Sequence, residues 1–158
     1  MTTEEKKPSA LEARLAEDLK QAMRDKNVVA RETLRMLKAE LLREQVKVDD
    51  PNDPQTEVDE LGVVMRAVKT RRDSVADYEK GGRAELAKNE LAEIEVLSAY
   101  LPKAMSDDEA RAALRAIAAE LGITQKKQMG QLMKVVQERH RGALEGARAS
   151  KLAGEFLS

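Results

Sequence analysis

The chain has 158 residues and a net charge of −1, and it is 42% hydrophobic and 36% charged, with three aromatic residues and no cysteine. The lack of cysteine excludes disulfides, thiolate metal sites and cysteine nucleophiles, and it suits a reducing compartment. Because no apolar run reaches 18 residues and the N-terminus resembles no signal peptide, we expect a cytoplasmic protein without membrane contact. Ala, Leu, Glu, Lys and Arg dominate while β-branched and aromatic residues are scarce, so the composition predicts an all-α fold.

The N-terminal part is expected to form a disordered tail over residues 1–8 and then two helices. Ser9 and Glu12 form the pattern of a capping box at the start of the first helix, which we expect to end at Asn27. The second helix is predicted over 29–46, before a DDPNDP segment in which Pro, Asn and Asp favour a turn. Both helices carry apolar residues at helical spacing: Leu11, Leu15, Leu19, Ala22 and Met23, then Ala30, Leu34, Leu37 and Leu41.

Two further helices are predicted to pair as an antiparallel hairpin, because the Gly-Gly pair at 81–82 interrupts a long amphipathic run. Two signals compete for the start of the third helix: the Asp-Pro pair at 53–54, and Thr56 followed by Asp59. The fourth helix is expected to end before Pro102. Their apolar positions are Leu61, Val64, Met65, Val68, Val75 and Tyr78, then Leu86, Leu91, Ile94, Leu97 and Leu101.

A domain boundary is predicted in the segment from Pro102 to Ser106, with an N-terminal helical domain over 9–102 and a small C-terminal three-helix domain over 106–158. Ser106 is expected to cap the first of the three helices, Gly122 to end it, and Thr124 to cap the second. Their apolar positions are Leu114, Ile117, Ala118 and Leu121, then Met129, Leu132, Met133 and Val136, then Ala149, Leu152, Ala153, Phe156 and Leu157.

The segment RHRGALEGARASKL, residues 139–152, contains the single histidine of the chain and two glycines four residues apart. A phosphate-binding Walker loop does not fit, because Ala147 stands where that loop requires lysine and no strand precedes it. His140 lies between two arginines, whose charges oppose the imidazolium that a general base forms, and it shows no metal-ligand spacing. We therefore predict no catalytic residue, metal or cofactor, and we interpret the segment as a corner in which Gly142 ends one helix and Gly146 lets the next begin in close contact.

Positive charge is concentrated near the C-terminus. Residues 1–105 carry 19 Lys/Arg and 22 Asp/Glu, whereas residues 126–151 carry seven cations and two anions. Such a segment can neutralise phosphates, and without an aromatic residue before Phe156 to stack on bases it favours the backbone of a folded RNA. A merely solubilising surface is the alternative. The predicted nucleic-acid-binding residues are Lys126, Lys127, Lys134, Arg139, Arg141, Arg148 and Lys151.

Other charged clusters are interpreted as solvated helix surfaces. Arg71 and Arg72 are expected to face water or to extend a basic surface. Acidic pairs such as Glu93 and Glu95 are also expected to face water, because 29 acids on helical surfaces produce such pairs without a functional reason.

Three segments resemble the GatB/YqeY family: TLRMLKAEL (33–41), the long run over 71–106, and the ending GALEGARASKLAGEFLS. The resemblance extends from about Leu11 to the C-terminus. It implies two helical units, as in small free-standing bacterial proteins similar to the tail of the GatB subunit of a tRNA-dependent amidotransferase, where the tail helps to recognise the tRNA body. It transfers no catalytic residue, and Ala147 replaces a lysine that relatives usually carry near the C-terminus.

The resemblance and the basic segment together predict a non-catalytic accessory module associated with tRNA or another folded RNA. A protein–protein adapter is the alternative, since long amphipathic helices also dock on a protein partner. A second alternative is a subunit of a carbon–nitrogen ligase that uses glutamine as amido donor, although glutaminase chemistry needs an activated nucleophile that we do not find.

Overall fold

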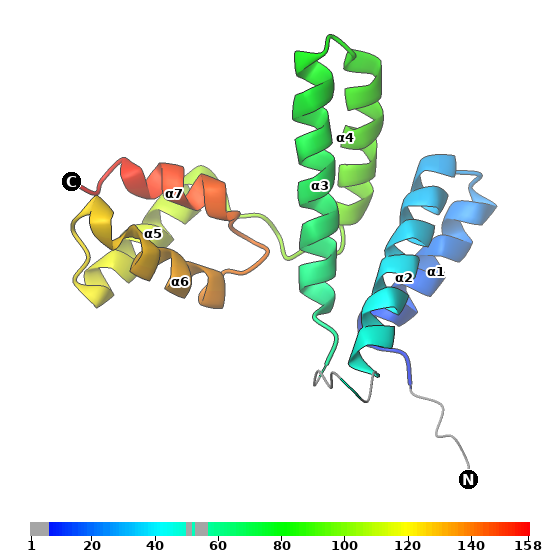
Figure 1. Cartoon of the computed structure of the whole chain (residues 1–158), viewed down its shortest axis with the longest axis horizontal. Helices are drawn as coiled ribbons and strands as arrows, with labels where there is room; N and C mark the ends of the chain where they lie inside the picture. Colours follow the sequence, from blue (N-terminus) through cyan, green and yellow to red (C-terminus); the bar gives the residue numbers. More distant parts are fainter. Residues whose placement is uncertain (1–6, 50–51, 53–56) are drawn as a thin grey trace. The chain divides into compact units, whose positions relative to one another are not determined.

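The computed structural model describes residues 7–49, 52 and 57–158, and every regular element in these ranges is helical, which confirms the predicted all-α fold. The chain divides into two compact units, an N-terminal unit that ends at Tyr100 and a C-terminal unit over Leu101–Ser158. The tail predicted over 1–8 lies mostly outside the described residues. The elements are α1 (Ala10–Arg24), α2 (Val28–Val48), α3 (Glu60–Lys80), α4 (Ala84–Ser98), α5 (Asp107–Leu121), the 3₁₀ helix η1 (Lys126–Gln128), α6 (Met129–Arg139) and α7 (Gly146–Gly154) (Figure 1).

The helices α1 and α2 form the first hairpin of the N-terminal unit (Figure 1). Ser9 caps α1 as predicted, because its hydroxyl oxygen accepts a hydrogen bond from the backbone N–H of Glu12. The prediction that Asn27 ends this helix is wrong. The chain leaves α1 three residues earlier, Lys26 adopts a φ of 53°, and the side chain of Asn27 instead caps α2 by accepting from the backbone N–H of Ala30.

The helices α3 and α4 form the predicted antiparallel hairpin, and Gly82 turns the chain between them with a φ of 70°. The third helix, α3, begins after Asp59, whose carboxylate accepts a hydrogen bond from the backbone N–H of Gly62. The two predicted starts, at the Asp-Pro pair 53–54 and at Thr56, lie outside the described residues. The fourth helix ends at Ser98, so Leu101 lies beyond it.

The core of the N-terminal unit is aliphatic, as the composition predicts. Two residues on the predicted apolar stripes are nevertheless exposed: Met23 keeps 53% of its surface accessible and Leu91 keeps 51%. The buried apolar residues of this unit are Leu15, Ala22, Leu34, Leu37, Leu41, Val63, Val64, Ala67, Val68, Ala87, Ile94, Leu97 and Tyr100. Helical periodicity therefore identifies most of this core, but not which stripe positions meet another helix.

Polar contacts join α1 and its N-cap residue to the start of α3 and to Tyr100, which follows α4. The hydroxyl of Tyr100 donates a 2.5 Å hydrogen bond to Asp18, and the guanidinium of Arg14 lies 4.5 Å from the centre of the tyrosine ring. Burial raises the pKa of Tyr100, and the hydrogen bond to Asp18 raises it further. The hydroxyl of Ser9, besides capping α1, donates to Glu60 at 2.6 Å.

The C-terminal unit is a three-helix bundle of α5, α6 and α7 (Figure 1). Ser106 caps α5 and Gly122 ends it with a φ of 69°, as predicted. The cap predicted at Thr124 is wrong, because the side-chain oxygen of Gln128 accepts from the backbone N–H groups of Thr124 and Gln125, and the chain enters α6 through η1. Leu121, predicted on the apolar face, is 42% exposed. The core consists of Ala110, Leu114, Ile117, Ala118, Ile123, Leu132, Val136, Leu144, Ala149, Leu152, Ala153 and Leu157.

Candidate functional site

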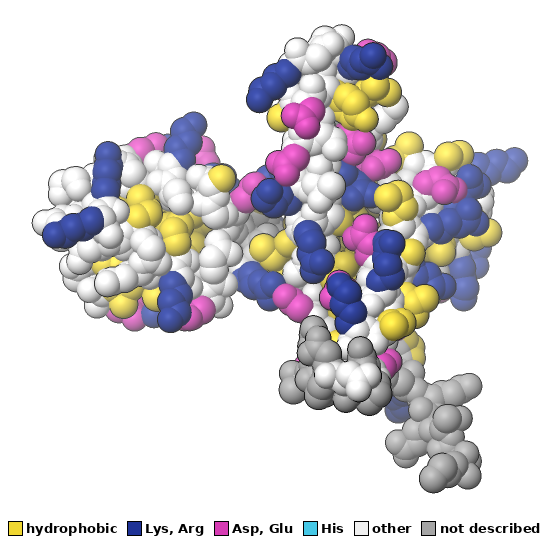
Figure 2. All heavy atoms as spheres, in the orientation of Figure 1, with side chains coloured by type: hydrophobic (Ala, Val, Ile, Leu, Met, Phe, Trp, Pro, Cys, Tyr) yellow, Lys and Arg dark blue, Asp and Glu magenta, His cyan; other side chains and the backbone are white. Residues whose placement is uncertain are grey.

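The cations of the predicted basic segment lie on η1, on α6, on α7 and at the corner between α6 and α7. Figure 2 shows the Lys and Arg side chains of the C-terminal unit as separate projections on the visible face, and not as one continuous patch. The segment therefore offers several spaced charges. Which of them are available to a ligand depends on how each is paired within its own unit.

Two of the seven predicted residues form ion pairs with α5. The guanidinium of Arg139 donates to both carboxylate oxygens of Glu120, at 2.7 and 2.6 Å, and it lowers the pKa of that carboxyl. Arg148 donates to the carboxylate of Asp107 at 2.8 and 3.0 Å and to the carbonyl oxygen of Met105. Both side chains thus connect helices of the bundle, and a ligand phosphate would have to displace a carboxylate to reach them.

The four lysines of the segment differ from these arginines. Lys126, Lys127, Lys134 and Lys151 are exposed, and no ion pair involves them among the described residues. Leu132 and Val136 face the core of the bundle, so Lys134, which lies between them on α6, points away from it. Arg141 is exposed at the corner. The structure thus separates four unpaired lysines from two paired arginines, a distinction that spacing along the sequence did not reveal.

The corner itself has the predicted form only in part. α6 ends at Arg139, Gly142 adopts a φ of 83°, and α7 begins at Gly146. A Cβ at Gly146 would lie 3.5 Å from the side-chain nitrogen of Gln137, which is ordinary contact, so the close approach predicted for this glycine is wrong.

The half-buried His140 accepts two backbone hydrogen bonds through its carbonyl oxygen, and no hydrogen bond or ion pair involves its imidazole within the described ranges.

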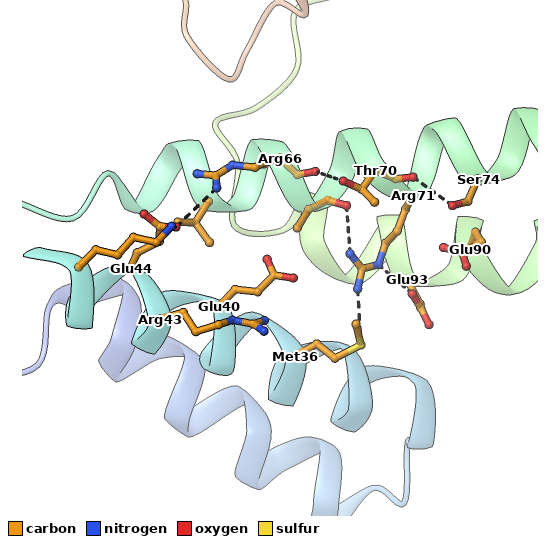
Figure 3. A pocket seen from close by; sticks show the side chains of 13 residues that line it. Met36, Glu40, Arg43, Glu44, Arg66, Thr70, Arg71, Ser74, Glu90 and Glu93 are labelled. Carbon is orange, nitrogen blue, oxygen red and sulfur yellow. Dashed lines mark hydrogen bonds and ion pairs between the residues drawn. The ribbon is translucent and has the colours of Figure 1, made fainter.

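A second candidate site is a cleft of about 480 Å³ in the N-terminal unit, between α2, α3 and α4 (Figure 3). Its walls carry acidic and basic side chains in equal number, and Met36 and Val63 contribute apolar surface. Glu44 pairs with Lys47 at 2.9 Å and with Arg66 at 3.6 Å, and Lys47 holds the pKa of this carboxyl below its ordinary value. The other charged lining residues are Glu40, Arg43, Arg71, Glu90 and Glu93.

Arg71 is the buried cation of this cleft, with 6% of its surface exposed, so the expectation that it faces water is wrong. Its Nε donates to Glu93 at 2.8 Å, one terminal nitrogen donates to the carbonyl oxygen of Ala67, and the other lies 3.7 Å from the sulfur of Met36 (Figure 3). The residue thereby links α3 to α4 and α2. The sequence contained a signal for this role, because Arg71 falls at helical spacing after Val64 and Val68, within the apolar stripe.

The described residues contain no group of three His, Asp or Glu side chains placed to hold a metal ion. Among the same residues, no helix is long and apolar enough to span a membrane. The cleft acids form ion pairs or line an open surface, and no nucleophile lies in hydrogen-bond contact with a base there. The observed arrangements can bind through charge, and we assign them no bond-breaking step.

The chain is similar to a protein family and to a curated mitochondrial protein. The profile of a family described as Yqey-like protein matches residues 12–157 of this chain. A curated protein of Vanderwaltozyma polyspora, named "Altered inheritance of mitochondria protein 41, mitochondrial", is 31% identical over 90 residues, which are 55% of this chain and 46% of that protein. The matched segment therefore spans about half the length of the curated relative.

Proposed function

The chain belongs to the Yqey-like protein family, and on that premise we propose that it is a non-catalytic accessory module of the cytoplasm that binds a folded RNA of the tRNA type. The C-terminal unit makes the contact, and its lysines neutralise phosphates of the RNA backbone. The resemblance to the tail of GatB supports the choice of RNA. The name of the mitochondrial relative states no ligand and adds no support.

The observation that carries this proposal is the availability of Lys126, Lys127, Lys134 and Lys151, which are exposed and make no ion pair within the described residues. Each ammonium can approach a phosphate without breaking an existing contact. Arg139 is excluded from the contact set, because its bidentate pair with Glu120 would have to open first.

The experiment is binding of a folded tRNA over a series of salt concentrations by the full chain and by a variant with four lysine-to-alanine substitutions. If the four lysines contact phosphates, the slope of log K against log salt falls by about 3, since each lost contact removes roughly 0.7–0.9. RNAs of different sequence weaken about equally, because backbone contacts read no bases. The substituted residues are Lys126, Lys127, Lys134 and Lys151.

A matched variant controls for net charge. It carries four alanine substitutions of exposed cations on helices of the N-terminal unit and is expected to retain the slope of the unmodified chain. Its substituted residues are Lys20, Arg24, Lys80 and Lys88. If both variants bind tRNA with the same affinity and the same slope as the unmodified chain, the RNA function of the C-terminal unit is rejected.

A further inference from the structure

Three charged side chains of the cleft between α2, α3 and α4 are unpaired in the described part of the chain. The cleft is lined by eight charged residues, four of each sign. One cluster of ion pairs is centred on Glu44 and a second joins Arg71 to Glu93, and together they engage five of the eight. No side-chain hydrogen bond or ion pair among the described residues involves the other three, which are Glu40, Arg43 and Glu90.

Contacts between α2 and α3 fix the position of Arg43 along the cleft. The two helices are antiparallel, because Glu44 pairs with Arg66 whereas Met36, about two turns earlier on α2, contacts Arg71. Arg43 is adjacent to Glu44 in the sequence and therefore lies at the level of Arg66. An unpaired cation thus marks one end of the cleft.

The two unpaired acids lie farther along. Glu40 is on the preceding turn of α2, and Figure 3 shows its carboxylate in the space between α2 and α3. Arg71 pairs with Glu93 of the antiparallel helix α4, so Glu90, three residues before Glu93, lies at the level of Ser74 (Figure 3). Both acids are half-buried, and a half-buried carboxylate without a partner favours a cationic ligand.

The spacing of these groups sets the length of a matching ligand. From the level of Arg66 to that of Ser74 the helix α3 rises by about 12 Å, at roughly 1.5 Å per residue. A hydrogen-bonded ion pair of about 2.8 Å at each end leaves about 6–7 Å between the outer charges of the ligand. The carboxyl carbon and the charged end of extended arginine or lysine are about 7 Å apart, since an extended chain gains about 3.3–3.6 Å per three bonds.

We propose that the cleft binds a free basic amino acid, arginine or lysine. Arg43 pairs with its α-carboxylate, Glu40 with its α-ammonium group and Glu90 with its side-chain cation, so that each charge of the ligand meets one unpaired group of opposite sign. The methylene chain packs on Met36, which is 49% exposed and whose sulfur lies 3.7 Å from Arg71. The cleft volume of about 480 Å³ falls within the roughly 300–1,000 Å³ of small-molecule sites.

Other ligand classes fit these charges less well. A phosphate group would lie near two unpaired carboxylates, and a diamine would leave Arg43 without a partner. No group of three acids among the described residues is placed to hold a metal ion. The cleft lies within the N-terminal unit, so this site is independent of RNA binding by the C-terminal unit.

The test is isothermal titration calorimetry of the full chain with L-arginine and L-lysine. Because the cleft is open and the ligand is small, we expect a Kd on the order of 0.1 mM. Three analogues of arginine each lack one charge: citrulline lacks the side-chain cation, agmatine the carboxylate and δ-guanidinovalerate the α-ammonium group. Each is expected to bind at least about tenfold more weakly than arginine, because one group of the cleft is left unpaired.

Matched variants assign each charge to a residue. Glu90→Gln, Glu40→Gln and Arg43→Gln are each expected to weaken arginine about tenfold, but to leave unchanged the affinity for the analogue that lacks the corresponding charge. Glu95→Gln removes an exposed acid of α4 outside the cleft and is expected to bind like the unmodified chain. Urea denaturation followed by tyrosine fluorescence verifies that each variant is folded.

Several results would overturn the proposal. The unmodified chain would show no binding of arginine or lysine, or it would bind citrulline or agmatine as tightly as arginine. The same conclusion follows if Glu90→Gln weakens arginine and citrulline equally, since the substitution would then act through the fold and not through the side-chain cation. The analogue series uses the unmodified chain, so it decides the question even if a variant does not fold.

Discussion

The buried ion pair between Arg71 and Glu93 predicts a specific pattern of stability changes. Glu93→Ala leaves a guanidinium that is 6% exposed without its carboxylate. Breaking a fully buried pair in this way costs about 3–5 kcal/mol. The side chain of Glu93 is 30% exposed, so water partly replaces it and we expect a loss of about 2 kcal/mol in the free energy of unfolding.

Arg71→Met keeps an apolar stem in the site and removes the charge that needs compensation. The carboxylate of Glu93 can then hydrate, so this substitution costs about 1 kcal/mol. The double variant Arg71→Met/Glu93→Ala is expected to be close to the single Arg71 variant and more stable than Glu93→Ala alone. The two substitutions are therefore non-additive by about 2 kcal/mol.

Tyrosine fluorescence during urea denaturation measures this effect in the full chain. The chain has no tryptophan and both of its tyrosines, Tyr78 and Tyr100, lie in the N-terminal unit, so the signal reports unfolding of that unit. With a urea dependence of about 2 kcal/mol per M, Glu93→Ala lowers the midpoint by about 1 M. Asp73→Ala, which breaks an exposed pair with Lys69, is the control and changes stability by less than about 0.5 kcal/mol. Additive effects of the two substitutions in the double variant would refute the assigned role of this pair.

Three further predictions concern the rest of the chain. Because the pKa of Tyr100 is raised in the folded state, the N-terminal unit should lose stability as the pH rises above the ordinary tyrosine pKa of about 10, and Tyr100→Phe should remove that loss when denaturation midpoints are compared across pH. In limited proteolysis, cleavage within 102–106 should precede cleavage within 60–78, and the reverse order would contradict two separately folded units. Given glutamine, ATP and misacylated tRNA, the purified chain should release no ammonia above blank, whereas turnover abolished by one Ser or His substitution would show an enzyme.

The helix boundaries show which structural features can be predicted from capping residues in the sequence. Ser9 and Ser106 cap helices as predicted, and Gly122 ends α5, because each signal acts on backbone groups within one helical turn. Asn27 was predicted to end α1, but it is the N-cap of α2. Asn is favoured at both kinds of position, so the residue type alone does not distinguish them. The start of α3 was missed because Asp59 was read as the partner of a cap at Thr56, whereas its carboxylate is itself the N-cap and accepts from the backbone N–H of Gly62.

The sequence by itself determined the helical class, the pairing of the two long helices around Gly81–Gly82 and most apolar core positions, because these depend on propensity and on the 3.6-residue period. Only the tertiary structure decided which charges are available. Arg139 meets Glu120 across 19 residues and Arg148 meets Asp107 across 41, while the lysines of the same segment remain unpaired in the described part of the chain. Whether a cation binds a neighbouring helix or a ligand depends on which helix faces pack together, and a one-dimensional pattern of charge does not contain that information.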